Sequence, residues 1–152
     1  MHRKDRVHIM KENAMKLEFA AKSENEAFAR SVVSAFALNL DPTIEEMADI
    51  KTSVSEAVTN SIIHGYEGMD GKVFVECIIS GREIKIVVKD NGKGIKNVKE
   101  AMQPMFTTNT DNERSGMGFT VMQTFMDKVK VESIVDVGTK VTMSKTIGAS
   151  AL

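Results

Sequence analysis

The sequence is poor in the residues that stabilise small secreted domains and cysteine-based metal sites. Its 152 residues include one cysteine, two prolines, one tyrosine and no tryptophan. A single cysteine excludes an intramolecular disulfide and a cysteine-based metal cluster. Cys77 lies in an alternating apolar segment, which predicts a buried and unreactive thiol.

The sequence also lacks a long apolar run and an excess of either charge. No segment approaches the length needed to cross a bilayer, and no signal-peptide pattern opens the chain. The 20 basic and 21 acidic residues give a net charge of -1, which provides no electrostatic attraction to nucleic acid or to an anionic membrane. We therefore expect a cytoplasmic protein that binds neither nucleic acid nor membrane directly.

Length and composition predict one globular domain. Hydrophobic residues make up 42% of the chain and charged residues 27%, which is typical of globular proteins. A chain of this length can build one core but has few residues for two. Residues 1–14 are polar and basic without periodicity and are expected to form a loose arm, whereas residues 15–152 are expected to form the domain.

Hydrophobic periodicity predicts the order of strands and helices. Strands are expected at residues 16–20, 72–79, 83–89, 129–135 and 139–146, and helices at 23–40, 43–65, 98–102 and 116–125. The polar segment 105–115 is expected to be a loop. Because most strands form hairpins and the helices lie between them, the predicted fold is an α+β sandwich, with helices on one face of a mixed, mainly antiparallel sheet.

The first predicted helix begins at a capping box formed by Ser23 and Glu26. Arg30 lies two positions after Phe28, roughly 200° around a helix of 3.6 residues per turn, and is expected to point away from the core. The apolar stripe that defines the core side of this helix consists of Phe28, Val32, Val33, Phe36 and Leu40.

The second predicted helix begins at the capping box of Thr43 and Glu46 and carries Glu56 and Asn60 one turn apart. Its apolar face is expected to contain Met47, Ile50, Val54, Val58 and Ile62. A carboxylate can accept a proton, and an amide oxygen beside it can bind a hard cation. Such a pair is also common on a solvated helix face. Gly65 suits the C-cap of this helix.

Two glycine-containing segments could bind a nucleotide. In Asp90-x-Gly92-x-Gly94, a strand-end carboxylate can accept a hydrogen bond from an exocyclic amine such as that of adenine, and the glycines allow close approach to a flat ring. The alternative for this segment is an ordinary Asn-Gly turn. Gly116 and Gly118 lead into the helix expected at 116–125, whose amino-terminal N–H groups suit phosphate.

Several common nucleotide-binding motifs are absent. Gly116-Met117-Gly118 follows a loop rather than a strand and lacks a third glycine, so it is not a dinucleotide fingerprint. The chain has no G-x-x-x-x-G-K-[ST] segment, which excludes the P-loop. It also lacks H-R-D and D-F-G, which excludes the common eukaryotic protein-kinase type.

Taken together, the motifs resemble a known superfamily. Glu56 with Asn60, Asp90-x-Gly92-x-Gly94, Gly116-x-Gly118 and Gly138-Thr139 are similar to the N, G1, G2 and final Gly-Thr boxes of the GHKL superfamily. That group includes gyrase, the Hsp90 chaperone, histidine kinases and the DNA-mismatch ATPases. The resemblance implies a Bergerat-type ATP-binding sandwich.

A narrower resemblance extends over about residues 15–147. SENEAFAR at 23–30, SEAVTNSIIHGY at 55–66, and MFTT at 105–108 with ERSGMGF at 113–119 resemble the anti-sigma F factors of endospore-forming bacteria. Members of that family form homodimers and bind and block a sporulation sigma factor. They also use ATP to phosphorylate a serine of the anti-anti-sigma factor.

The resemblance implies a role for each matching residue, with ATP or ADP and Mg²⁺ as cofactors. Glu56 would be the general base and Asn60 the Mg²⁺ ligand. The adenine would be read by Asp90 and Thr139, beside a wall shaped by Gly92 and Gly94. Phosphates would be held by Gly116 and Gly118 under a lid at 104–115 whose Arg114 reaches the terminal phosphate. Thr107, Thr108 and Ser115 would also contact the nucleotide, and Arg30 would contact the protein partners.

Three other functions share part of this pattern. A related stress-response anti-sigma kinase would use the same chemistry on another sigma factor. A detached histidine-kinase module fits less well, because the chain has no four-helix phosphoacceptor segment and two of its three histidines lie in residues 1–14. A module that only holds ATP would not need Glu56. His64 could be an alternative base, but stabilisation at the helix C-terminus is the simpler interpretation.

Overall fold

The computed structural model describes residues 12–104 and 118–148. The strands are β1 (Asn13–Ala20), β2 (Lys72–Ser80), β3 (Glu83–Asp90), β4 (Lys128–Ile134) and β5 (Gly138–Thr146). The helices are α2 (Asn25–Ala37), α3 (Ile44–Thr59), α4 (Val98–Ala101) and α6 (Phe119–Phe125), with a 3₁₀ turn at Leu38–Leu40 and a π-helical turn at Asn60–Gly65. This order is the one that the periodicity predicts.

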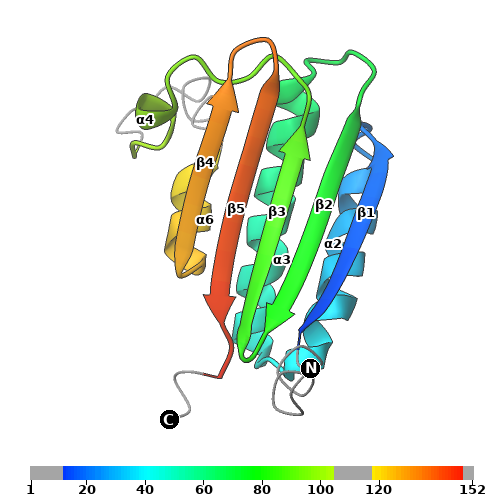
Figure 1. The fold of residues 1–152 in the computed structure, drawn as a ribbon, viewed down its shortest axis with the longest axis vertical. Coiled ribbons are helices and arrows are strands. Elements are labelled where there is room, and N and C mark those ends of the chain that lie inside the picture. The colour runs from blue at the N-terminus through cyan, green and yellow to red at the C-terminus, as the bar shows by residue number, and fades with distance from the viewer. Residues whose placement is uncertain (1–11, 105–117, 149–152) are drawn as a thin grey trace, which may run out of the picture.

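The five strands form one sheet in the order β1-β2-β3-β5-β4. Every pairing between the described strands is antiparallel. Helices α2, α3 and α6 lie on one face of this sheet (Figure 1). The predicted α+β sandwich is therefore confirmed, and its sheet is antiparallel throughout the described residues.

Alternation along the strands places the core between the sheet and the helices. On β2 and β3, every second side chain is buried, including Val75, Ile84 and Ile86. Cys77 belongs to this inward-facing set and is fully buried, and burial raises the pKa of its thiol to about 12. The prediction of a buried thiol is confirmed.

The capping box at the start of α3 is present. The Thr43 hydroxyl accepts a hydrogen bond from the Glu46 N–H at 3.1 Å, and the Glu46 carboxylate accepts one from the Thr43 N–H at 3.0 Å. Both unpaired N–H groups are thereby satisfied. Of the predicted apolar face, Ile50, Val54, Val58 and Ile62 are buried, and Met47 is half-buried.

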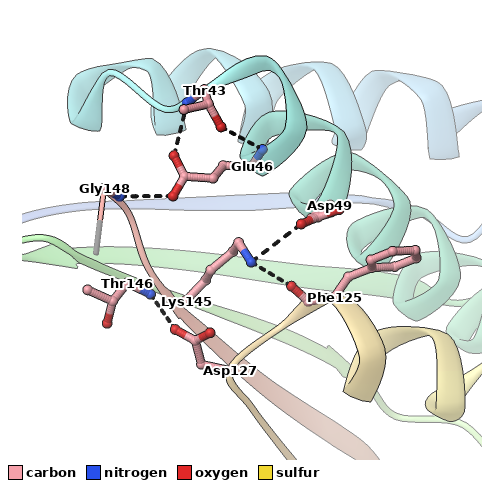
Figure 2. Close-up of polar contacts among 8 residues, drawn as sticks. All are labelled: Thr43, Glu46, Asp49, Phe125, Asp127, Lys145, Thr146 and Gly148. Carbon is pink, nitrogen blue, oxygen red and sulfur yellow. Dashed lines mark hydrogen bonds and ion pairs between the residues drawn. The ribbon is translucent and has the colours of Figure 1, made fainter. Parts of the chain in front are cut away.

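Polar contacts fix the far end of α6 against its neighbours (Figure 2). The Lys145 ammonium of β5 donates a hydrogen bond to the Phe125 carbonyl at 2.7 Å and lies 3.5 Å from the Asp49 carboxylate of α3. The Asp127 carboxylate accepts a hydrogen bond from the Thr146 N–H at 2.7 Å. Because the C-terminal end of α6 is tied to α3 and β5, its first residues are held beside the C-terminal half of α3.

Helix α2 differs from the prediction in its start and in its buried face. Its N-cap is Glu24, with no side-chain capping bond, so the capping box of Ser23 and Glu26 is wrong. Of the predicted apolar stripe, Val33 and Leu40 are buried and Phe36 packs against the core, but Phe28 is 51% exposed. Ala29, Ser34 and Ala37 complete the buried face of the helix, and the predicted periodicity did not select these three residues. The small side chains of the buried set allow close packing.

Candidate functional site

The C-terminal end of α3 meets the ends of β3 and β5 in one pocket. Asp90 ends β3 and lies directly opposite Thr139 of β5 in the antiparallel register. The turn after α3 lies beside them. Four residues predicted for the nucleotide site line this pocket together: Asn60, Asp90, Gly94 and Thr139. His64 and Phe119 also line it.

Gly65 is not the C-cap that the sequence predicts, because the helical backbone continues to a C-cap at Tyr66. Residues Asn60–Gly65 form a π-helical turn, closed by a hydrogen bond from the Tyr66 N–H to the Ser61 carbonyl at 3.2 Å. Gly65 remains helical, and positive φ occurs later, at Glu67 and Gly68. Gly65 instead allows the turn to pack closely against Asp90, because a Cβ there would lie 3.1 Å from the Asp90 carboxylate.

Asp90 is a buried carboxylate with most of its acceptor capacity used. It is 3% exposed and accepts a hydrogen bond from the Gly92 N–H at 2.9 Å. The Ser61 hydroxyl and the Thr139 N–H also donate to it. Burial raises the pKa of Asp90 above its ordinary value, and these hydrogen bonds offset part of the rise. An ionised carboxylate only accepts hydrogen bonds, so Asp90 is suited to an external donor such as an amine.

Gly92 and Gly94 are required by contacts within the protein. A Cβ on Gly92 would lie 2.2 Å from the Gly65 carbonyl oxygen. Gly94 has φ +75°, and a Cβ there would lie 2.4 Å from the Ile134 carbonyl oxygen. The same two glycines were predicted to approach a flat ring. In the structure, their lack of a Cβ lets the loop after β3 pack against the backbone of Gly65 and the backbone of Ile134.

Glu56 lies one turn before Asn60 on α3, at the groove between α2 and α3 and beside the residue that precedes α6. Its carboxylate rests against the backbone before α6, because a Cβ on Gly118 would lie 2.1 Å from Glu56 Oε2. Gly118 has φ +66° and is the N-cap of α6. Burial raises the pKa of Glu56, and the negative charge of Glu26 raises it further. A carboxylate held in this way is a better proton acceptor than an exposed one.

Comparison with known proteins identifies the family. Residues 19–145 match the family described as Histidine kinase-like ATPase domain. The Anti-sigma F factor of Thermoanaerobacter sp. (strain X514) is 61% identical over 137 residues, which cover 90% of this chain and 96% of that protein. The Anti-sigma F factor of Clostridium kluyveri is 56% identical over 140 residues, which cover 92% of this chain and 99% of that protein. The chain belongs to the anti-sigma F factor family.

Solved structures agree on the fold. The RsbU and RsbW domains of a Mycobacterium tuberculosis protein match with a TM-score of 0.65 at 16% identity, over 89% of this chain and 32% of that one. The catalytic domain of histidine kinase ThkA matches with a TM-score of 0.55 at 15% identity, over 88% of this chain and 96% of that one. Both show the ATPase-domain sandwich. No helix in the described residues is long and apolar enough to span a membrane.

Arg30 lies outside the buried face of α2, as predicted, and its side chain is 42% exposed and reaches across to α3. Its guanidinium lies 3.4 Å from the Ser55 hydroxyl and 3.7 Å from the Glu26 carboxylate. Arg30 and Glu56 line the same groove between α2 and α3, which has a volume of about 840 Å³.

Part of the predicted site lies outside the described residues. This applies to Thr107, Thr108, Arg114, Ser115 and Gly116, and to the lid apart from residue 104. Their proposed contacts with phosphate remain predictions.

Asn60 fits a magnesium site with few protein ligands. The described residues contain no group of three or more His, Cys, Asp or Glu side chains that could hold a metal. Mg²⁺ commonly uses one or two protein oxygens and completes its shell with phosphate and water. The amide of Asn60, on the wall of the pocket, is a donor of the required type.

Two serines of the site were missed by sequence analysis. The Ser61 hydroxyl binds Asp90. Ser133 accepts a hydrogen bond from the Ile95 N–H at 2.7 Å and pairs with the Thr139 hydroxyl at 2.8 Å. A signal for Ser133 was available: alternation puts it on the inward face of β4 after Val129 and Val131, where a polar residue needs a partner.

Proposed function

We propose that this protein is an anti-sigma factor and an ATP-dependent serine kinase. It binds and inhibits a sporulation sigma factor, and it phosphorylates and thereby inactivates the anti-anti-sigma factor. It acts in the cytoplasm as a homodimer. The relatives at 56–61% identity, all called Anti-sigma F factor, favour this sporulation role over a stress-response system.

The kinase proposal rests on the position of Glu56 on α3. Glu56 precedes Asn60 by one helical turn, so a proton acceptor stands next to the proposed metal ligand. Its raised pKa comes from burial and from the charge of Glu26. A module that only holds nucleotide has no use for a proton acceptor in this position.

The proposed reaction transfers the terminal phosphoryl group of ATP to a serine. Glu56 takes the proton of the serine hydroxyl as its oxygen bonds to the γ-phosphorus. The bond from that phosphorus to the bridging oxygen breaks, and ADP leaves with the electron pair. When bound, Mg²⁺ neutralises charge on the phosphates. Asn60 would hold the ion, and the Asp90 carboxylate would fix the base by accepting a hydrogen bond from it.

Incubation with labelled ATP tests the function directly. The purified protein is mixed with ATP labelled on its terminal phosphate, Mg²⁺ and candidate anti-anti-sigma proteins. We expect phosphoserine on one candidate and none on an unrelated serine-rich protein. Label found only on histidine of this chain, or only as inorganic phosphate, would contradict the proposed activity.

Replacing Asp90 by asparagine should weaken ATP binding and reduce the preference for ATP over GTP. The carboxylate only accepts hydrogen bonds, whereas an amide can present its NH₂ group to the adenine amine. Losing a charge-assisted hydrogen bond costs about 1.5–3 kcal/mol, which corresponds to a loss of affinity of roughly 10–150-fold. Calorimetric titration with ATP and GTP measures both effects. Asp127→Asn, the same change at the far end of the fold, should leave both unchanged.

Replacing Arg30 by glutamate should weaken capture of both protein partners. The guanidinium is accessible beside the groove that leads to Glu56, and its planar fork suits a carboxylate of the partner. Nucleotide affinity should stay intact, because Arg30 does not line the pocket of Asp90. Pull-downs of sigma factor and anti-anti-sigma factor, with ATP or ADP, measure the loss. Lys130→Glu on the edge strand β4 is the control, and equal capture by both variants would remove Arg30 from the interface.

A further inference from the structure

The buried side chain of Tyr66 joins the segment after α3 to the backbone at Gly71, at Lys72 and at Asn91, the residue after Asp90. It is 8% exposed, and its ring packs against the backbone of Gly71, where a Cβ would lie 2.3 Å from the ring. Its hydroxyl donates a hydrogen bond to the Lys72 carbonyl at 2.5 Å and accepts one from the Asn91 N–H at 2.8 Å. The hydroxyl therefore connects the start of β2 to the residue that follows Asp90.

The π-helical turn is what brings Tyr66 to this position. In a regular α-helix, Tyr66 would follow Ile62 at the i+4 position on the core face. The bond from the Tyr66 N–H to the Ser61 carbonyl instead spans five residues, which places Tyr66 below Ser61. Ser61 binds the Asp90 carboxylate, and Tyr66 binds the Asn91 N–H. The turn thus holds two consecutive residues at the end of β3.

The same segment is confined from its other side. The β3–β5 pairing ends at Asp90 and Thr139, so the described strands provide no ladder partner for the Asn91 N–H. A Cβ on Gly138 would lie 2.1 Å from the Asp90 carbonyl oxygen and 2.9 Å from Asn91 Cα. The backbone of Asp90 and Asn91 is therefore clamped between Gly138 and the Tyr66 hydroxyl.

We infer that Tyr66 is a positioning residue for recognition of the nucleotide base, acting through its hydroxyl on the backbone of Asn91. This inference rests on the proposed binding of ATP at Asp90. The hydroxyl fixes the direction from which the Asp90 carboxylate meets the base. Its hydrogen bonds go to the backbone of Lys72 and Asn91, so it sets base affinity and base preference while the transfer of phosphate proceeds unchanged.

Tyr66→Phe tests the inference, because it removes the hydroxyl and keeps the ring on Gly71. A neutral hydrogen bond contributes about 0.5–1.5 kcal/mol, so ATP and ADP affinities should fall by the same factor, roughly 2–13-fold. The KM for ATP should rise by that factor with kcat unchanged, and the preference for ATP over GTP should fall. Thr124→Val is the control. It removes a hydroxyl that donates a hydrogen bond to a backbone carbonyl, that of Thr120, within α6.

Three results would overturn the inference. The first is unchanged ATP affinity, ADP affinity and base preference in Tyr66→Phe, even with lowered thermal stability. The second is a fall in kcat at constant KM, which would place the effect at the reacting groups. The third is loss of cooperative unfolding, which would assign the hydroxyl to folding.

The proposed function is tested separately by the wild-type protein and Asp90→Asn in the same titrations. If the wild type does not bind ATP, or if Asp90→Asn retains full base preference, the proposed base recognition fails. If Asp90→Asn loses base preference and Tyr66→Phe keeps it, only the role of Tyr66 fails.

Discussion

Glu56→Gln is expected to reduce phosphotransfer by a factor of about 10² or more, as removal of a general base does. The amide has nearly the same shape as the carboxylate but cannot take the proton of the serine hydroxyl. Binding of ATP and ADP should be unchanged, since Glu56 does not line the pocket of Asp90. The initial rate of phosphoserine formation and calorimetric titration of the same variant measure the two properties.

The fold of Glu56→Gln should be at least as stable as that of the wild type. A raised pKa means that the surroundings disfavour the ionised carboxylate relative to the unfolded chain. At neutral pH the substitution removes this burial cost and the repulsion from Glu26. Glu45→Gln, an exposed position in the first turn of α3, is the matched control for loss of one negative charge. A transfer rate close to that of this control would remove Glu56 from the mechanism.

Gly92→Ala is expected to destabilise the protein and abolish nucleotide binding. The added Cβ would lie 2.2 Å from the Gly65 carbonyl oxygen. That carbonyl cannot withdraw freely, because it accepts a hydrogen bond from the Lys93 N–H at 2.8 Å and belongs to the π-helical turn. Overpacking typically costs about 1–3 kcal/mol. Because the displaced atoms are backbone next to Asp90, we expect the upper part of this range and a pocket of altered shape.

Gly68→Ala separates this steric effect from the general cost of replacing a glycine. Gly68 has φ +84° and nothing within 4 Å of an added Cβ, so alanine there meets only backbone strain. Denaturant unfolding should show a larger loss for Gly92→Ala, and calorimetry should show normal ATP affinity for Gly68→Ala alone. A Gly92→Ala protein that binds ATP normally would show that the loop relaxes without harm to the pocket.

The sequence by itself determined the order of elements, most of the buried face of α3 and the family. The periods of two and 3.6 residues lie within single segments, and the Thr43–Glu46 capping box spans only four residues. Each of these signals can therefore be recognised in the local sequence. The glycine and acidic motifs are likewise read along the chain. Their joint spacing gives the GHKL resemblance, and the longer segments at 23–30, 55–66 and 105–119 give the anti-sigma F resemblance, which identities of 56–61% over about nine-tenths of the chain confirm.

Only the tertiary structure decided how these segments meet. The packing of α2 buried Ala29 and Ala37 beside the predicted Val33 and left Phe28 exposed, and it brought Arg30 within reach of Ser55 on α3. The π-helical turn and the position of β5 between β3 and β4 brought Tyr66 onto the loop after Asp90. Such contacts join residues 25 or more positions apart. They depend on which surfaces fit each other in space, and no local periodicity records that choice.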